Sequence, residues 1–196
     1  MTQLGIGLYA ANHHENALSV QEAELSMKRR LGVPEDVILV IQGNLANSYR
    51  KLGRCDEALR VRQEVYSGRL EVSGEEHAET LIAANNYAVS LNGLQSFKEA
   101  KALLRKTMPV ARRSLGEDHI TTLRMRLNYA HSLYEDDSAT LDDLREAVTS
   151  LKELAPYARR TLGGMHPTTG LIEESLRDAR AALTARETPP TSNNAY

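Results

Sequence analysis

Apolar positions in residues 77–116 recur at steps of three and four, the spacing of one face of a helix. The first stretch carries Leu81, Ala84, Tyr87, Ala88 and Leu91, and the second carries Phe97, Ala100, Leu103 and Leu104. Gly93 lies between them, where a left-handed C-cap would end the first helix, and Ser96 is a suitable N-cap for the second. The pattern predicts a pair of antiparallel helices.

The same pair of helical stretches repeats along the chain. Four dipeptides that end in glycine lie 42, 42 and 47 residues apart, at Leu31-Gly32, Ser73-Gly74, Leu115-Gly116 and Leu162-Gly163. An asparagine follows each of the first three glycines by 12 residues, and an alanine comes two residues later, at Asn44 and Ala46, Asn86 and Ala88, and Asn128 and Ala130. A period of this length indicates a repeat array, because one helix pair cannot bury its apolar side alone.

The spacing predicts an all-α solenoid of stacked antiparallel helix pairs, with units at about 1–32, 33–74, 75–116 and 117–163. Ser175 and Arg177 replace the recurrent asparagine and alanine in the last helical stretch, 167–187, so we expect a C-terminal capping helix there. Residues 188–196 are expected to form a disordered tail. The first unit is incomplete, because Met1 falls inside its expected first helix. Either that helix is short, or the chain is a fragment of a longer array.

Three local features carry separate predictions. Cys55 stands at the register position of Phe97, which favours a small buried hydrophobic residue over a reactive thiol. Pro109 and Pro156 fall inside expected second helices and predict a bend or break on the outer layer.

Five extra residues enlarge the acidic turn at 134–140. Insertions in arrays fall in turns, so this one is either a solvated loop or an acidic specificity element.

Composition narrows the class of partner. The chain has 24 Lys and Arg against 26 Asp and Glu, and this near balance argues against nucleic acid as the main partner. It has no tryptophan and a single cysteine, which suit thin helical layers in a reducing compartment. Neither a signal peptide nor an apolar run of 18 residues is recognisable, so we expect a cytoplasmic location and no membrane contact.

Histidines recur in the linkers, but they do not form a metal motif. His77, His119 and His166 belong to successive units, so at least two helix widths of about 8–10 Å separate them, whereas metal ligands lie about 2 Å from one ion. We expect them to be turn and helix-start residues. The sequence also contains no glycine-rich phosphate loop and no nucleophile elbow. It therefore predicts no enzymatic activity, no metal and no cofactor.

One unit carries a recognisable signature, with Leu45-Ala46-x-x-Tyr49, Gly53 and Glu57-Ala58-Leu59. This pattern resembles the tetratricopeptide repeat. The 42-residue spacing, the Asn44-Leu45-Ala46 motif and the linker Leu115-Gly116-Glu117-Asp118-His119 are similar to the kinesin light chain subtype. The resemblance covers residues 4–185 and implies a right-handed superhelix whose first helices line a concave, peptide-binding face. The chain lacks the heptad coiled coil that binds a kinesin heavy chain, which argues against a motor subunit.

Kinesin light chains bind short acidic segments with an aromatic anchor, so the resemblance implies a protein or peptide partner of that kind. Carried over by register, the candidate groove residues are Val40, Asn44, Asn47, Arg50, Ile82, Asn85, Asn86, Val89, Asn92, Arg124, Asn128, His131 and Tyr134. A side-chain amide carries donors and an acceptor, so it can pair with any peptide backbone. The recurrent asparagines could instead tie neighbouring units together, and the sequence leaves these two alternatives open.

The favoured function is thus a non-catalytic module that binds an extended peptide or a partner protein in the concave groove. The alternative is a structural or self-associating array, possibly part of a larger scaffold. This alternative follows from the incomplete first unit, because an unpaired helix exposes apolar surface.

Overall fold

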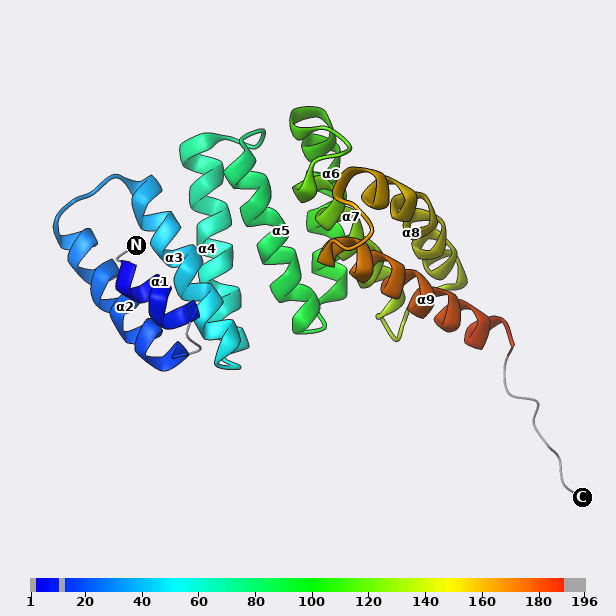
Figure 1. The fold of residues 1–196 in the computed structure, drawn as a ribbon, viewed down its shortest axis with the longest axis horizontal. Coiled ribbons are helices and arrows are strands. Elements are labelled where there is room, and N and C mark those ends of the chain that lie inside the picture. Colours follow the sequence, from blue (N-terminus) through cyan, green and yellow to red (C-terminus); the bar gives the residue numbers. More distant parts are fainter. Residues whose placement is uncertain (1–2, 11–12, 189–196) are drawn as a thin grey trace, which may run out of the picture.

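The computed structural model describes residues 3–10 and 13–188, which form helices joined by turns, without a strand in these ranges (Figure 1). The helices of this part of the chain are α1 (Gln3–Ala10), α2 (His14–Arg30), α3 (Glu35–Lys51), α4 (Cys55–Ser73), α5 (Ala78–Gly93), α6 (Phe97–Leu115), α7 (Ile120–Tyr134), α8 (Leu141–Leu162) and α9 (Pro167–Glu187). The predicted all-α class is confirmed. Of the predicted tail, Thr188 caps α9, and residues 189–196 lie outside the described part.

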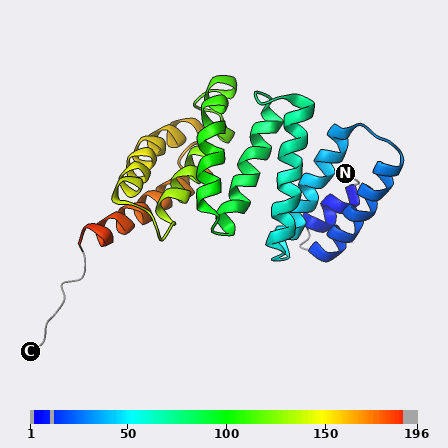
Figure 2. The same cartoon turned by 180° about the vertical axis from the view of Figure 1, so that it is seen from behind.

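Successive helices pack against one another, and the pairs stack in a curved row from α1 to α9 (Figures 1 and 2). First helices of the later pairs also touch, since α5 packs against α7 and α7 packs against α9. The second helices α4, α6 and α8 have no comparable contact with one another in the described chain. The first helices therefore form the tighter inner layer of an α-solenoid, and the second helices form its outer layer.

Small residues mark the places where the two helices of a pair approach closely. The buried alanines of the first helices are Ala46, Ala88 and Ala130, and those of the second helices are Ala58, Ala100 and Ala147. A larger side chain there would force the helices apart. The larger apolar residues form two clusters, one between α2 and α3 and one that extends from α5 to α9. Between these clusters lies α4, which contributes two buried arginines, Arg62 and Arg69.

The recurrent histidines cap the first helices, in agreement with the role expected of them. In each, the imidazole Nδ1 accepts a hydrogen bond from the backbone N–H two residues later, at 3.2, 3.2 and 3.1 Å for His77, His119 and His166. Each histidine thus satisfies a backbone N–H that a helix start leaves without an intrahelical partner. The same cap at the same register gives three first helices a common starting point.

The end of α5 differs from the expectation in one detail. Gly93 is the last helical residue, and Gln95, two residues later, has a left-handed φ of 58°. The preceding unit has Gly53 at the register position of Gln95, with φ of 75°. The expectation that Gly93 forms the left-handed cap is therefore wrong, because the turn reverses at the later position.

Both internal prolines lie within uninterrupted helices. Pro109 is inside α6 and Pro156 is inside α8, so neither proline breaks its helix, and a bend is what remains of the expectation. Both rings are exposed on the outer layer, where water can reach the carbonyl group that a proline leaves without its usual donor. Cys55 is also a correction, since it is half-buried at the first residue of α4 rather than buried.

The acidic turn between α7 and α8 is held by side chains from two other helices. Lys101 of α6 pairs with Asp136 at 3.3 Å. Arg186 of α9 donates hydrogen bonds to the carbonyls of Ala139 and Asp137 at 3.1 and 3.3 Å. The turn is therefore a structural anchor between α6 and α9 rather than a freely solvated loop.

Candidate functional site

Five of the predicted groove residues line one hollow between α3 and α5. Its volume is about 190 Å³. Its lining includes Val40, Asn44 and Asn47 from α3 and Ile82 and Asn86 from α5. The side chains of Val40 and Ile82 are 47% and 36% exposed, so both present apolar surface at the hollow. The hollow thus offers apolar contact and amide groups side by side.

The three amides of this hollow keep groups available to a ligand. Asn44 Nδ2 donates to the Val40 carbonyl of its own helix at 2.9 Å, which leaves its Oδ1 as an acceptor. Asn47 Oδ1 accepts a hydrogen bond from Arg62 at 3.0 Å, which leaves its Nδ2 as a donor. The exposed Asn86 side chain makes no hydrogen bond within the described chain. An extended backbone presents both donors and acceptors, and this set can meet both.

The matching amides between α5 and α7 are tied to one another. Asn128 Nδ2 donates to Asn85 Oδ1 at 2.8 Å. Asn92 Nδ2 donates to the Asn128 backbone carbonyl at 2.9 Å. Asn85 and Asn92 are buried, although we expected both to face a ligand. Between α5 and α7, therefore, the amides brace neighbouring units.

Two positions of the first helices account for this difference. Gly43 stands at the register position of Asn85 and has no side chain that could accept a hydrogen bond from Asn86. Arg50 stands at the register position of Asn92 and is exposed. Asn86 therefore keeps its amide because the preceding first helix lacks both bracing residues and packs less closely against α5 than α7 does. This signal is present in the sequence, but only when neighbouring units are compared position by position.

The remaining predicted residues lie outside the hollow. Arg50 and Arg124 are exposed, and Val89 is half-buried. His131 and Tyr134 pack against each other with their ring centroids 5.5 Å apart. Burial lowers the pKa of His131 and raises the pKa of Tyr134, so both side chains are neutral near pH 7.

Two arginines of α4 belong to this region and were not predicted. Arg69 lines the hollow, and Arg62 holds one of its amides; each is 6% exposed. Burial, with a smaller effect from the nearby Arg50 charge, lowers the pKa of Arg62 to about 10, so this residue stays charged near pH 7. A comparison of register positions could have identified both arginines, because the next unit has Leu104 and Ala111 at these two positions.

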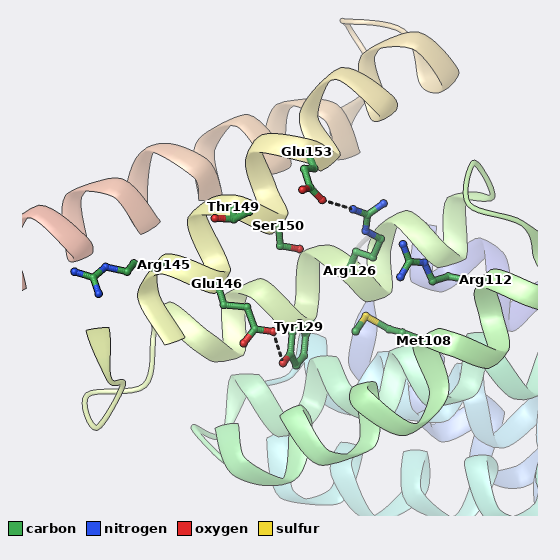
Figure 3. A pocket seen from close by; sticks show the side chains of 9 residues that line it. All are labelled: Met108, Arg112, Arg126, Tyr129, Arg145, Glu146, Thr149, Ser150 and Glu153. Carbon is green, nitrogen blue, oxygen red and sulfur yellow. Dashed lines mark hydrogen bonds and ion pairs between the residues drawn. The ribbon is translucent and has the colours of Figure 1, made fainter. Parts of the chain in front are cut away.

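A second cleft opens on the outer layer between α6 and α8, beside α7 (Figure 3). Its volume is about 470 Å³, and it is lined by Met108, Arg112, Arg126, Tyr129, Arg145, Glu146, Thr149, Ser150 and Glu153. In Figure 3 the Tyr129 hydroxyl donates to Glu146 at 2.8 Å, and Arg126 turns toward Glu153. Three arginines and two glutamates line the cleft, and ion pairs and hydrogen bonds within the chain engage both glutamates.

Within the described residues, no group of histidine, cysteine, aspartate and glutamate side chains could hold a metal ion. The helices of that part also include none that is long and apolar enough to cross a membrane. The hollow between α3 and α5 is the place where several predicted site residues meet, and it is the candidate site.

The family model of the tetratricopeptide repeat matches residues 37–108, which include α3, α5 and the hollow between them. Residues 37–108 therefore match the tetratricopeptide repeat. Such repeats generally mediate protein–protein interactions. The matched residues cover the second and third helix pairs, whereas the four pairs and α9 all share the same solenoid arrangement.

Solved structures extend the likeness of these repeats over 94% of the chain. Two are forms of nearly identical TPR-like repeats from a Podosopora anserina protein designated a kinesin light chain. One form, a variant, has 20% identity and a TM-score of 0.78 over 85% of that chain, and the other form has 20% identity and a TM-score of 0.75 over 86%. The third is BtubC (BKLC) from P. vanneervenii, with 18% identity and a TM-score of 0.70 over 76% of that chain.

A search of curated proteins found no match. The resemblance to the tetratricopeptide repeat is nonetheless confirmed by the repeat model, and the fold is shared with the kinesin light chain-like repeat structures. At identities of 20% and below, the shared fold by itself does not assign a ligand.

Proposed function

We propose that this chain is a non-catalytic interaction module that binds an extended peptide segment of a partner protein in the hollow between α3 and α5. The main support for this proposal is that Asn44, Asn47 and Asn86 each keep amide groups that form no hydrogen bond within the chain. These groups lie beside the exposed side chains of Val40 and Ile82. An amide pairs with the ligand backbone whatever its sequence, and the apolar side chains add contact area.

Charge favours an acidic segment. Arg69 of α4 lines the hollow, and Arg62 of α4 lies behind the Asn47 amide. Arg50 is exposed near the end of α3. Glu79 is the only carboxylate among the residues that line the hollow. These cations attract acidic residues and speed their encounter with the groove. An aromatic anchor on the ligand would cover Val40 and Ile82. A cytoplasmic partner belongs to the same proposal, since the single cysteine suits a reducing compartment.

The test uses the absence of tryptophan from this chain. Peptides of eight to ten residues, with several acidic residues and one tryptophan, are titrated with protein while tryptophan fluorescence is followed. We expect saturable binding that weakens in Asn44→Ala and Asn86→Ala. Asn16→Ala, an exposed asparagine on the outer-layer helix α2, is the matched control.

Two results would end the proposal. One is a lack of binding by every acidic aromatic peptide tested. The other is binding that Asn86→Ala and Asn44→Ala leave as tight as Asn16→Ala does. A peptide with lysines in place of its acidic residues separates the contribution of charge from that of the amides and the apolar side chains.

Self-association is the second candidate, and exposed apolar residues at the end of α2 favour it. Met27 and Leu31 are 45% and 68% exposed, next to the short first helix α1. An apolar patch of this kind can bind another copy. Light scattering across a wide concentration range tests it: a constant monomeric mass excludes self-association, and a mass that rises with concentration and falls in Leu31→Ser supports it.

A further inference from the structure

Arg62 occupies a position that the third and fourth units fill with leucine. Leu104 and Leu151 stand at the same register in α6 and α8, and each is fully buried in the apolar core. Arg62 is 6% exposed, so a guanidinium group lies where the repeat normally places a core side chain. A buried charge is costly unless its hydrogen bonds compensate for lost water. This position therefore calls for a reason beyond packing.

The contacts of Arg62 are all to neutral acceptors. Its Nη1 donates to the Asn86 backbone carbonyl at 2.8 Å and to Ser90 Oγ at 2.9 Å. Its Nη2 donates to Asn47 Oδ1 at 3.0 Å. No carboxylate of the described residues forms an ion pair with it. The side chain thus reaches from α4 to both first helices that form the hollow, α3 and α5.

The next interface along the chain lacks these partners of the arginine. Val89 stands at the register position of Asn47, so no amide faces Leu104 there. Ser132 stands at the register position of Ser90 and donates instead to a carbonyl of its own helix, at Tyr129, over 2.7 Å. Arginine, asparagine and an engaged serine therefore occur together at one interface, and that interface is the one with unengaged groove amides.

We propose that Arg62 is a positioning residue of the groove, which orients the Asn47 amide with its Nδ2 toward the ligand and holds α3 in place against α5. The inference rests on the proposed function, because Asn47 matters only if the hollow binds a backbone. An amide can otherwise turn about its terminal torsion and present either its oxygen or its nitrogen. Arg62 has donors alone, so it can pair only with the oxygen, and the nitrogen is left to the groove.

The test variant is Arg62→Leu, which introduces the residue that the third and fourth units have at this position. We expect it to fold and to be at least as heat-stable as the wild-type chain, because Leu104 and Leu151 show that leucine packs at this position. We expect its affinity for an acidic tryptophan peptide to fall by about tenfold, the loss of one well-placed hydrogen bond. Arg62→Lys keeps the charge but not the fork of donors, so its affinity should lie between the two. Arg105→Leu, an exposed arginine of α6, is the control.

A second readout needs no ligand. In the wild-type chain the side-chain NH2 resonances of Asn47 should have chemical shifts displaced from those of a solvent-exposed asparagine, and in Arg62→Leu they should move toward the values of a freely turning amide. A role limited to packing would change stability without altering these resonances. The proposal falls if Arg62→Leu binds as tightly as Arg105→Leu while Asn86→Ala binds more weakly. It also falls if the Asn47 resonances are the same in both proteins. If the wild-type chain binds no peptide but the resonances change as expected, the proposed function fails and the positioning role stands.

Discussion

The interfaces between α3 and α5 and between α5 and α7 use the same register positions, yet they differ in what they leave for a ligand. Between α5 and α7, Leu104 fills the core and Asn128 is tied to the neighbouring helix. Between α3 and α5, Arg62 fills the equivalent position and Asn86 has no tie. The second and third units are therefore joined by a polar interface, and the third and fourth by an apolar one.

The contrast between these interfaces shows that, in a repeat array, one interface can supply stability while another keeps polar groups available for a ligand. The apolar cluster from α5 to α9 supplies the burial that holds the later units together. The polar interface gives up some of that burial and keeps amides available instead. Substitutions that exchange residues between the two interfaces can break this contrast or measure it more closely.

The largest effect is expected when the buried leucine of the apolar interface is replaced by arginine, the residue of the polar interface. Leu104→Arg would bury a guanidinium group beside Val89, with no amide to receive it, and should lower the free energy of unfolding by about 3–5 kcal/mol. Urea denaturation followed by circular dichroism measures it. Arg62→Leu, the reverse exchange, is the control and should unfold at the same or a higher urea concentration. A loss below about 1 kcal/mol for Leu104→Arg would mean that both interfaces accept charge.

Removing the asparagine brace should have the next largest effect. Asn128→Ala leaves the buried Asn85 Oδ1 without its donor and should cost about 1–3 kcal/mol. Asn86→Ala removes an exposed amide at the same register and should change the free energy of unfolding by less than about 0.5 kcal/mol. Equal costs for the two variants, by urea denaturation, would remove the distinction between bracing and available amides.

The helix caps should not distinguish the two interfaces. His77→Ala and His119→Ala each remove one cap acceptor, at the starts of α5 and α7, and each should cost about 1 kcal/mol. His77→Asn and His119→Asn should retain most of that stability, since asparagine is a good N-cap. Thermal unfolding curves of the four variants measure it. If removing the cap lowered the stability at only one of the two helices, the two interfaces would differ at more than the second-helix and asparagine positions.

The smallest effect concerns pH and belongs to the α7 side. Burial lowers the pKa of His131 in the folded chain, although Glu135 and Asp178 oppose the shift. The unfolded chain therefore takes up the proton first as the pH falls below about 6.5, and the folded state loses stability until the pH has passed below the lowered pKa. His131→Val copies Val89 of the preceding unit. It should flatten the pH dependence of the unfolding midpoint between pH 7 and 5, and an unchanged slope would contradict this assignment.

Much of the fold could be predicted because its signals are local. The period of the asparagines and glycines predicted the stacking, the three- and four-residue steps predicted both helices of a pair, and the linker histidines marked helix starts. The errors at Gly93 and in the expectation of a break at the prolines concern where a helix ends or is interrupted. Those outcomes depend on the geometry of a turn and on access of water to a free carbonyl.

Less of the candidate site could be predicted, because register places a residue on a face without deciding its partner. Val40 and Ile82 do line the hollow, since exposure on the inner layer follows from helical spacing. Asn85 and Asn92 shared that face by spacing alone, yet they are buried and engaged. Arg62 was overlooked because an arginine within an outer helix is ordinarily assigned to solvent.

By itself, the sequence determined the repeat, the helix pairs, the small residues at their crossings and the caps, since each depends on neighbours within a few turns. Only the tertiary structure decided which asparagines brace and which stay available, and that Arg62 turns inward. These outcomes depend on partners 15 to 43 residues away, in other helices. A hydrogen bond forms or fails over a few tenths of an ångström, and that separation is set by how closely the stacked helices pack.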